Sequence, residues 1–264
     1  SVQTLGIGLG VLPGQASALK CHTNVNDVLG VNGVPVSNEV LSGENLDCVK
    51  QAFERLNDWE NAFQECRTNK ITAALTLYNG ATYLFHPNGT YSRMSKGKTR
   101  IDLGYPTKMP GGWKGLPSTW HSSISAALPY KGSEKSYMFR NAEYARLKVV
   151  TVDSGYPTRM PGGWQGIPSS WNGQVDAALH YQPNSKHYMF KGNQYIRLTG
   201  TKVDSGYPTT LPGEWKGMPT EFTDGIDAAT YRNGHVYMFK GDKYIRFKGM
   251  AIESGYPKSI QDNW

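Results

Sequence analysis

Cysteine is absent from the last three quarters of this 264-residue chain, because Cys21, Cys48 and Cys66 all lie within the first 66 residues. Disulfides therefore cannot cross-link the larger part of the chain to itself. One disulfide plus a free thiol is the simplest arrangement. In a single unbroken helix Cys48 and Cys66 would lie roughly 27 Å apart, too far to bridge. Either the helix breaks between them or Cys21 supplies the partner.

Long apolar runs and dense runs of one charge are also absent. No segment approaches the ~20 apolar residues needed to span a bilayer, so no membrane span is expected. The net charge is +7, with −3 in residues 1–70 (5 basic against 8 acidic) and +10 in residues 71–264 (23 against 13). The basic residues are scattered rather than clustered, which indicates a solvated surface. We expect no nucleic-acid partner.

The linear motifs of common catalytic sites are missing as well. The chain has no His-Glu-x-x-His metal motif, no Gly-x-Ser-x-Gly nucleophile turn and no glycine-rich phosphate loop after a strand. Its six histidines are scattered through the chain. These absences predict that the protein is not an enzyme.

A fourfold repeat dominates what is present. The segments "ITAAL", "ISAAL", "VDAAL" and "IDAAT" begin at residues 71, 124, 175 and 226, which gives spacings of 53, 51 and 51 residues. Each is followed by a Tyr-x-Phe segment, by an arginine and then by an acid before Gly-Tyr-Pro. The arginines are Arg93, Arg146, Arg197 and Arg246, and the acids are Asp102, Asp153, Asp204 and Glu253. Residues that recur in every unit indicate scaffold, and these pairs predict a repeated cross-strand ion pair.

Each unit contains four short apolar segments separated by Asn-Gly, Lys-Gly or Pro-Asn turns, which is typical of antiparallel strands. Four strands in about 50 residues describe a propeller blade. We therefore predict an all-β fold, a four-bladed β-propeller over residues 71–264, with blades at about 71–123, 124–174, 175–225 and 226–264. The Ala-Ala pairs suit the crowded innermost strands. The repeated connector, as in "SGYPTRMPGGWQGIPSSW", would carry the chain from the outer edge of one blade to the inner strand of the next.

The pattern "IDAA…YMFKGDKYIRF…SGYP…WKGMP" resembles the hemopexin repeat, which builds four-bladed propellers, and the resemblance covers residues 71 to about 260. Members of that family include haem carriers, modules of matrix metalloproteinases and of vitronectin, and plant and fungal proteins that bind polyamines, haem or sugars. The resemblance thus implies the fold and leaves the ligand open. Many members join the first and last blades by a disulfide. Cys66 has no partner near Trp264, so closure of the ring must rest on packing, with Trp264 as a plug.

Residues 1–70 lie outside the repeat and carry all three cysteines. Apolar residues recur there at steps of three and four in "LDCVKQAFERLNDWENAFQEC", which predicts an amphipathic helix or a broken helical pair. Such a segment would pack on the propeller or serve as a separate partner-binding module.

The resemblance also implies a structural cation in the central channel, since hemopexin-like rings hold one on main-chain carbonyls. An oxygen-only site favours calcium or sodium. The matching positions are Thr72, Ser125, Asp176 and Asp227, with Ala74, Ala127, Ala178 and Ala229 one layer away. Haem is the alternative cofactor. Its axial ligands would be His180, His187 and His235, in adjacent blades.

The connectors supply the candidate ligand contacts, Tyr105, Trp113, Tyr156, Trp164, Tyr207 and Trp215. Sugars stack their C–H faces on such rings, and repeated weak sites gain affinity on a repetitive target. The same tryptophans could instead fill the gaps between blades. Our leading hypothesis is a non-enzymatic lectin of the defence type that binds glycans. The alternatives are a carrier of haem or a polyamine at the channel mouth, and a protein-interaction scaffold.

Asn88-Gly89-Thr90 is a glycosylation sequon, and it predicts passage through the secretory pathway if it is modified. Ser1 in place of a methionine is compatible with a removed signal peptide, so we expect a secreted protein. The oligomeric state, the source and the cysteine pairing stay open at this point.

Overall fold

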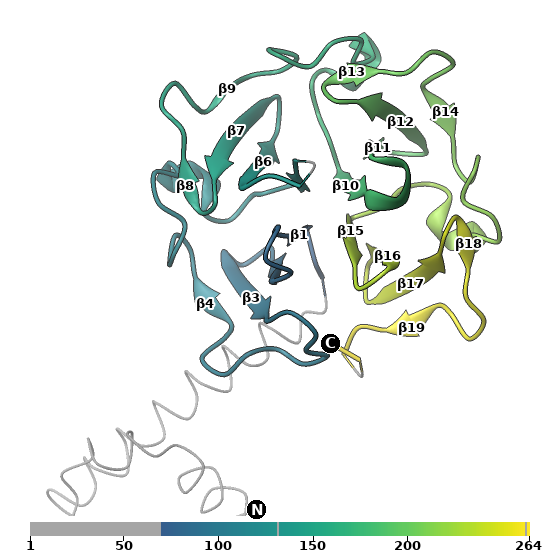
Figure 1. Ribbon diagram of the computed structural model, residues 1–264, viewed down its shortest axis with the longest axis horizontal. Coiled ribbons are helices and arrows are strands. Elements are labelled where there is room, and N and C mark those ends of the chain that lie inside the picture. Colours follow the sequence, from purple (N-terminus) through teal and green to yellow (C-terminus); the bar gives the residue numbers. More distant parts are fainter. Residues whose placement is uncertain (1–69, 131, 262) are drawn as a thin grey trace, which may run out of the picture. The chain divides into compact units, whose positions relative to one another are not determined.

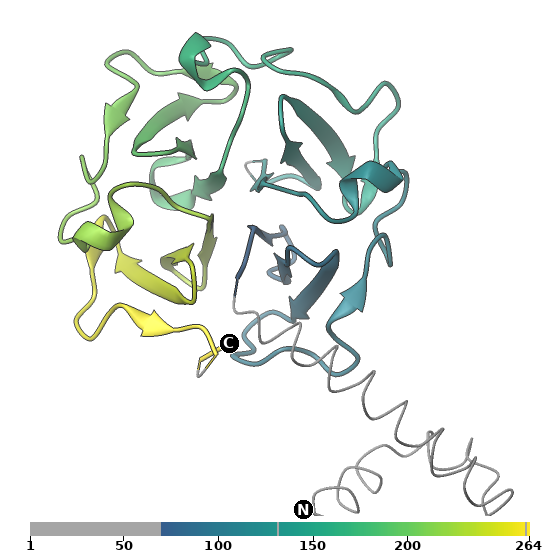
Figure 2. The same cartoon turned by 180° about the vertical axis from the view of Figure 1, so that it is seen from behind.

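The computed structural model describes residues 70–130, 132–261 and 263–264. Within these ranges 19 strands form four antiparallel sheets, and the helical elements are four 3₁₀ turns of three residues each. Figures 1 and 2 show the four sheets from opposite sides, placed around a common centre. The predicted four-bladed, all-β propeller is confirmed. The predicted N-terminal helix and the cysteine pairing lie outside the described residues.

Blade one has four strands, whereas blade two has five. Blade one consists of β1 (Ala73–Thr76), β2 (Thr82–Phe85), β3 (Thr90–Met94) and β4 (Thr107–Lys108), in that order. Blade two consists of β5 (Ala126–Pro129), β6 (Lys135–Arg140), β7 (Glu143–Lys148), β8 (Thr151–Val152) and β9 (Thr158–Arg159). Both β8 and β9 pair with β7, so the connector adds a two-residue strand that the repeat did not predict.

Blades three and four also have five strands each. Blade three consists of β10 (Ala177–Tyr181), β11 (Lys186–Lys191), β12 (Gln194–Thr199), β13 (Lys202–Val203) and β14 (Thr209–Thr210). Blade four consists of β15 (Ala228–Arg232), β16 (His235–Lys240), β17 (Lys243–Lys248), β18 (Ala251–Ile252) and β19 (Lys258–Ser259). The 3₁₀ turns are η1 (Ser118–Trp120), η2 (Ser169–Trp171), η3 (Gln182–Asn184) and η4 (Thr220–Phe222).

The four inner strands β1, β5, β10 and β15 contact one another around the centre of the ring. Their paired alanines are at most 1% exposed and lie in the clusters between blades. Ala126 and Leu128 of blade two, for example, share a cluster with Ala178 and Met189 of blade three. Successive residues of a strand point to opposite faces, so each inner strand contributes to both neighbouring junctions. Small side chains are needed there because four strands converge.

The Gly-Pro connectors link the blades as predicted. In three of them a short parallel bridge attaches the connector to the next blade, as Lys114 does to Thr151. Gly162 shows why a glycine is needed in the Pro-Gly turn. It has φ +50°, and a Cβ at this position would lie 2.6 Å from the Tyr144 hydroxyl oxygen. That oxygen accepts a 3.0 Å hydrogen bond from the N–H of Gly163, which ties the turn to blade two.

Blade four and blade one are not consecutive in the chain, so the ring closes between them by contacts alone. The Thr76 and Thr230 hydroxyls form a 2.8 Å hydrogen bond across this junction. Ile260 and Trp264, from the end of the chain, pack into the same cluster as Ile71 and Leu84 of blade one. Packing thus closes the ring, with Trp264 in the predicted position. Among the described residues no helix is long and apolar enough to span a membrane.

Candidate functional site

Every blade carries the predicted ion pair between its third strand and the acid that precedes Gly-Tyr-Pro. The Nε–Oδ2 distances are 2.8 Å for Arg93 and Asp102, 2.6 Å for Arg146 and Asp153, and 2.7 Å for Arg197 and Asp204. Arg246 and Glu253 form the same pair. In each case the acid's backbone N–H also donates to the arginine's carbonyl oxygen, at 2.8–2.9 Å. The cross-strand pair is therefore a fourfold feature of the scaffold.

The tyrosine of each Gly-Tyr-Pro lies against the same arginine. The guanidinium carbon stands 4.9–5.2 Å from the ring centroid in all four blades, a cation–π arrangement. All four tyrosines are half-buried. We call each arginine, acid and tyrosine a rim unit. The four units are Arg93–Asp102–Tyr105, Arg146–Asp153–Tyr156, Arg197–Asp204–Tyr207 and Arg246–Glu253–Tyr256. Each one places a tyrosine edge, a guanidinium and a carboxylate at one partly exposed place.

The connector tryptophans do not present a ring face to solvent, so the prediction that they stack on sugars is wrong. Trp113, Trp164 and Trp215 are 1%, 2% and 0% exposed. Trp164 packs against Tyr137, Phe139 and Tyr144 of blade two, with ring centroids 4.9–6.1 Å apart. These aromatic rings come from a different part of the blade and close over the indole. The tryptophans fill the junctions between blades.

Trp264 is not among the predicted ligand contacts, and it fills a junction between blades as the connector tryptophans do. Its ring centroid lies 5.1, 4.9 and 5.5 Å from those of Tyr237, Phe239 and Tyr244. The sequence carried a signal for it, because Trp264 follows Tyr256 by eight residues, as Trp164 follows Tyr156. The fourth copy of the connector thus extends to its tryptophan.

The four polar positions predicted at the channel make the same backbone hydrogen bond, and the side chains of Ser125, Asp176 and Asp227 bind other groups of the protein. The backbone N–H groups of Thr72, Ser125, Asp176 and Asp227 each donate to the carbonyl of the opposite phenylalanine at 2.9 Å. The Ser125 hydroxyl donates to the Val175 carbonyl of the next blade. Asp176 forms an ion pair with Lys191, and Asp227 accepts the N–H of Gly241. The alanines at 74, 127, 178 and 229 offer only main-chain atoms.

Two of the predicted haem ligands lie together, and the third does not join them. His180 and His187 face each other across β10 and β11, with ring centroids 4.8 Å apart and at most 7% of each residue exposed. That spacing leaves no room for a porphyrin between the two rings, so they are not an axial pair. His235 lies at the start of β16, and its Nδ1 is hydrogen-bonded to the Asn233 carbonyl oxygen.

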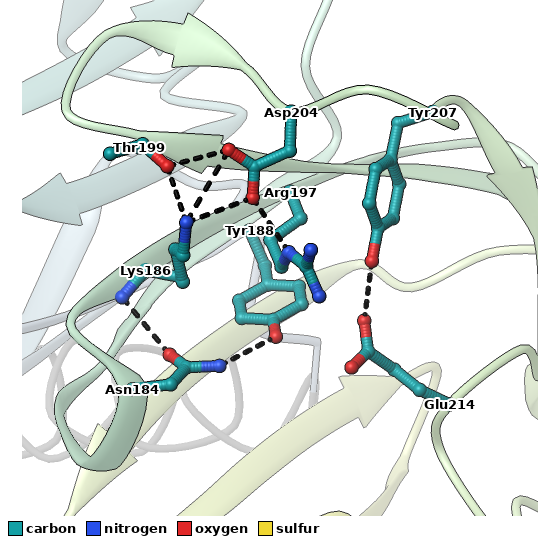
Figure 3. A network of polar contacts seen from close by, with 8 residues as sticks. All are labelled: Asn184, Lys186, Tyr188, Arg197, Thr199, Asp204, Tyr207 and Glu214. Carbon is teal, nitrogen blue, oxygen red and sulfur yellow. Dashed lines mark hydrogen bonds and ion pairs between the residues drawn. The ribbon is translucent and has the colours of Figure 1, made fainter.

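Blade three carries a more extended polar network than the other blades (Figure 3). Asp204 accepts hydrogen bonds from Arg197, Thr199 and Lys186. Burial by itself would raise the pKa of this carboxyl, but the three donors outweigh burial and lower the pKa to about 2. The carboxylate is therefore charged at any physiological pH.

The same network engages two tyrosine hydroxyls. Tyr207 donates a 2.8 Å hydrogen bond to Glu214, and Tyr188 accepts one of 3.0 Å from Asn184 (Figure 3). Burial and the Glu214 hydrogen bond raise the pKa of Tyr207. Glu214 replaces the second glycine of the "PGGW" connectors. This exception in the repeat could have identified the Glu214–Tyr207 contact from the sequence.

The comparisons with known proteins agree with this geometry. The family model described as Hemopexin matches residues 175–220 and 226–264, which form blades three and four. Matrix metalloproteinase-18 of Xenopus laevis is 30% identical over 47% of this chain and 25% of its own length. Human vitronectin is 32% identical over 49% of this chain and 26% of its own length. The matching stretch therefore spans about a quarter of these curated relatives.

Solved structures match a larger share of the chain. A seed albumin of Lathyrus sativus, a plant lectin of Cicer arietinum with two metal-binding sites, and a Cicer arietinum albumin that shows hemagglutination each cover 74% of this chain and 95% of their own. Their TM-scores are 0.60–0.61 at 22% identity, a likeness that shows the fold alone. The last two blades thus match the Hemopexin family model, and the chain shares its four-bladed propeller fold with these solved structures.

Proposed function

We propose that the propeller is a non-catalytic binding module that recognises glycans through its four rim units. The observation that carries the proposal is the repetition of one half-exposed Arg–acid–Tyr arrangement in every blade. Four equivalent weak sites around one ring suit a target that is itself repetitive, because linked sites raise avidity steeply.

The chemistry of a rim unit matches that of a sugar. The guanidinium covers one face of the tyrosine, which leaves the ring edge and the remaining polar groups of the unit for a ligand. Arginine donates hydrogen bonds to sugar hydroxyls and the carboxylate accepts them. The tyrosines thus remain in the proposed site, whereas the buried tryptophans do not. In blade three the tyrosine hydroxyl binds Glu214, whereas in blades two and four it is hydrogen-bonded to the buried Tyr144 or Tyr244.

Two structural neighbours support this choice of ligand class. One is described as a plant lectin and another as an albumin that shows hemagglutination. Both share the propeller with this chain at 22% identity. They favour a binding function over catalysis and a sugar over other ligands.

Replacing Tyr105, Tyr156 and Tyr207 together by phenylalanine is expected to reduce the agglutination titre at least about tenfold, because the loss at each site multiplies under avidity. The rings and their guanidinium contacts remain, so the fold is kept. Titres on red cells and binding to a glycan array measure the effect.

The matched control replaces Tyr91, Tyr144 and Tyr195, which are buried in the same three blades, by phenylalanine. The control should lose stability, because each hydroxyl accepts a backbone N–H, and keep its titre. Equal agglutination titres for the two triple variants would contradict the proposal that the rim units bind glycans. A silent array together with a Soret band on haem titration would favour the carrier alternative.

The carrier alternative retains one supporting observation, which concerns polyamines rather than haem. Asp176 and Asp227 precede the inner strands of adjacent blades, and Asp227 has no ion-pair partner among the described residues. Two carboxylates at one channel mouth suit a polycation. A protein-interaction scaffold would need only the outer faces of the blades.

We also propose a structural calcium or sodium ion in the channel. Each inner strand is the edge of its sheet, so alternate carbonyls on its other side are unpaired within the sheet. Four such edges meet at the centre, which fits oxygen-only coordination. Among the described residues no cluster of three or more His, Cys, Asp or Glu could hold a metal. Main-chain oxygens would therefore hold the ion, and one structural neighbour is described as having two metal-binding sites.

Removing calcium with a chelator is expected to lower the melting temperature. At a free ion concentration about a hundred times the Kd, binding of such an ion would stabilise the fold by about 2.7 kcal/mol. Scanning calorimetry with the chelator, then with excess calcium restored, measures the shift. A second series with potassium in place of sodium separates the two ions, and unchanged melting in both series would contradict the proposal.

Secretion is part of the same proposal. Asn88 is exposed in the turn between β2 and β3, and Thr90 Oγ1 donates to its side-chain oxygen at 2.7 Å. The sequon is therefore accessible to modification in the folded blade.

A further inference from the structure

Blade one departs from the repeat between its arginine and its acid. Arg93 and Asp102 lie nine residues apart, whereas the equivalent pairs of the other blades lie seven apart. In blades two to four this stretch contains a short strand, β8, β13 or β18. Blade one has no such strand in the part of the chain that the structure describes. Residues 95–101, "SKGKTRI", form a longer segment instead, which we call the basic loop.

The basic loop carries three positive charges that the described residues do not neutralise. Lys96, Lys98 and Arg100 are exposed, and none of them forms an ion pair with a described residue. The neighbouring acid, Asp102, is already bound by Arg93 and Ser95. The loop therefore presents a local positive field to solvent.

A fourth cation lies beneath the loop and comes from the adjacent blade. Arg232 ends β15, is 4% exposed, and donates from Nη2 to the Lys98 carbonyl. Its Nε has no hydrogen-bond partner, and no carboxylate pairs with it, among the described residues. The equivalent residues of the other blades, Leu77, Tyr130 and Tyr181, are uncharged.

A buried guanidinium without a counter-charge is unfavourable. Burial accordingly lowers the pKa of Arg232. An anion that reached the loop would supply the missing charge. Arginine suits that role because its planar N–H groups match the oxygens of a carboxylate or sulfate.

We propose that the basic loop and Arg232 form a binding site for a sulfate or carboxylate group carried on an acidic polysaccharide. The turn beside the loop contributes an aromatic ring as well. The aliphatic part of Lys96 packs against Gly80, and Tyr78, in the same turn, is 53% exposed. A sugar ring can stack on one exposed tyrosine, whereas single-stranded nucleic acids use successive aromatic platforms along a basic groove. The basic loop joins Arg93 to Asp102 of the first rim unit, but the proposed site uses none of that unit's side chains, so it holds whether or not the rim tyrosines bind sugar.

The first experiment measures binding to immobilised dextran sulfate and to polygalacturonate, with neutral dextran as the reference and poly(U) as the competing polyanion. Replacing Lys96, Lys98 and Arg100 together by glutamine should weaken binding to an acidic polysaccharide at least about tenfold. The matched control replaces Lys114, Lys202 and Lys216, which are exposed on other segments, by glutamine. The control removes as many charges and should change the affinity less than about threefold.

The second experiment replaces Arg232 by methionine, which keeps the length of the side chain and removes its charge. Without ligand, the melting temperature should stay the same or rise, because apolar replacements of buried charges are often neutral or stabilising. The rise in melting temperature that dextran sulfate or polygalacturonate gives the parent protein should largely disappear.

Three results would overturn the proposal. Equal weakening by both triple variants would show only general electrostatic attraction. Tighter binding to poly(U) than to either polysaccharide would identify a nucleic-acid site. A destabilised Arg232→Met protein with unchanged polysaccharide affinity would show that Arg232 serves only to hold the Lys98 carbonyl. If that variant does not fold, the loop variants still decide the matter.

Discussion

Replacing Trp164 by alanine is expected to lower the free energy of unfolding by about 3–5 kcal/mol. The indole is 2% exposed and packs against three aromatic rings of blade two, so its removal leaves a cavity that the rigid strands cannot fill. Urea denaturation followed by circular dichroism measures the change. The denaturant slope should remain the same, because the surface exposed on unfolding does not change.

Trp164→Phe is the matched control, since it keeps an aromatic ring in the junction and should lose less than half as much stability. Glycan binding by the folded fraction of either variant should equal that of the parent protein. Unchanged stability with lost binding in Trp164→Ala would instead return the tryptophan to the ligand site.

Replacing Trp264 by alanine is expected to lower the free energy of unfolding by about 2–4 kcal/mol, less than for a fully buried tryptophan because Trp264 is half-buried. The loss should be local. Trp264 packs against Tyr237, Phe239 and Tyr244, and it lies at the junction of blade four with blade one, two blades that are not consecutive in the chain. Blade four should therefore separate from blade one before the rest of the ring unfolds.

Hydrogen exchange measures this effect by segment. Exchange should quicken in β1, β15 and β16, while β5–β7 stay protected. Gln261→Ala, at an exposed neighbouring position, is the control and should leave exchange unchanged. Uniformly faster exchange around the ring would show that Trp264 stabilises the propeller as a whole rather than its closure.

The repeat alone was enough to predict the sheets, the ring and the ion pairs. A propeller needs recurring short strands, small inner residues and turning connectors, and all of these are local features of the sequence. The role of the tryptophans was not local. A tryptophan between Pro-Gly turns is compatible with an exposed sugar site and with a filled junction, and the rings that cover Trp164 come from residues 20–27 positions away. Whether a connector tryptophan is buried therefore depends on how two blades pack against each other.

The functional candidates divide in the same way. Aligning the four repeats is enough to identify three of the candidates. These are the four Gly-Tyr-Pro tyrosines, the basic loop, which is two residues longer than its counterparts in the other blades, and the glutamate at position 214. Two other findings depend on how the ring packs. His180 and His187 lie too close to hold a porphyrin between them, and Arg232 lies buried under a loop that is 134 residues distant in the sequence.

By itself, the sequence determined that this chain forms four equivalent blades and where each blade differs from the others, because strand periodicity and turn chemistry act over a few residues. Only the tertiary structure decided which aromatic rings and charges face solvent. Burial arises at the junctions, where side chains from separate blades meet, and no single repeat contains both sides of a junction.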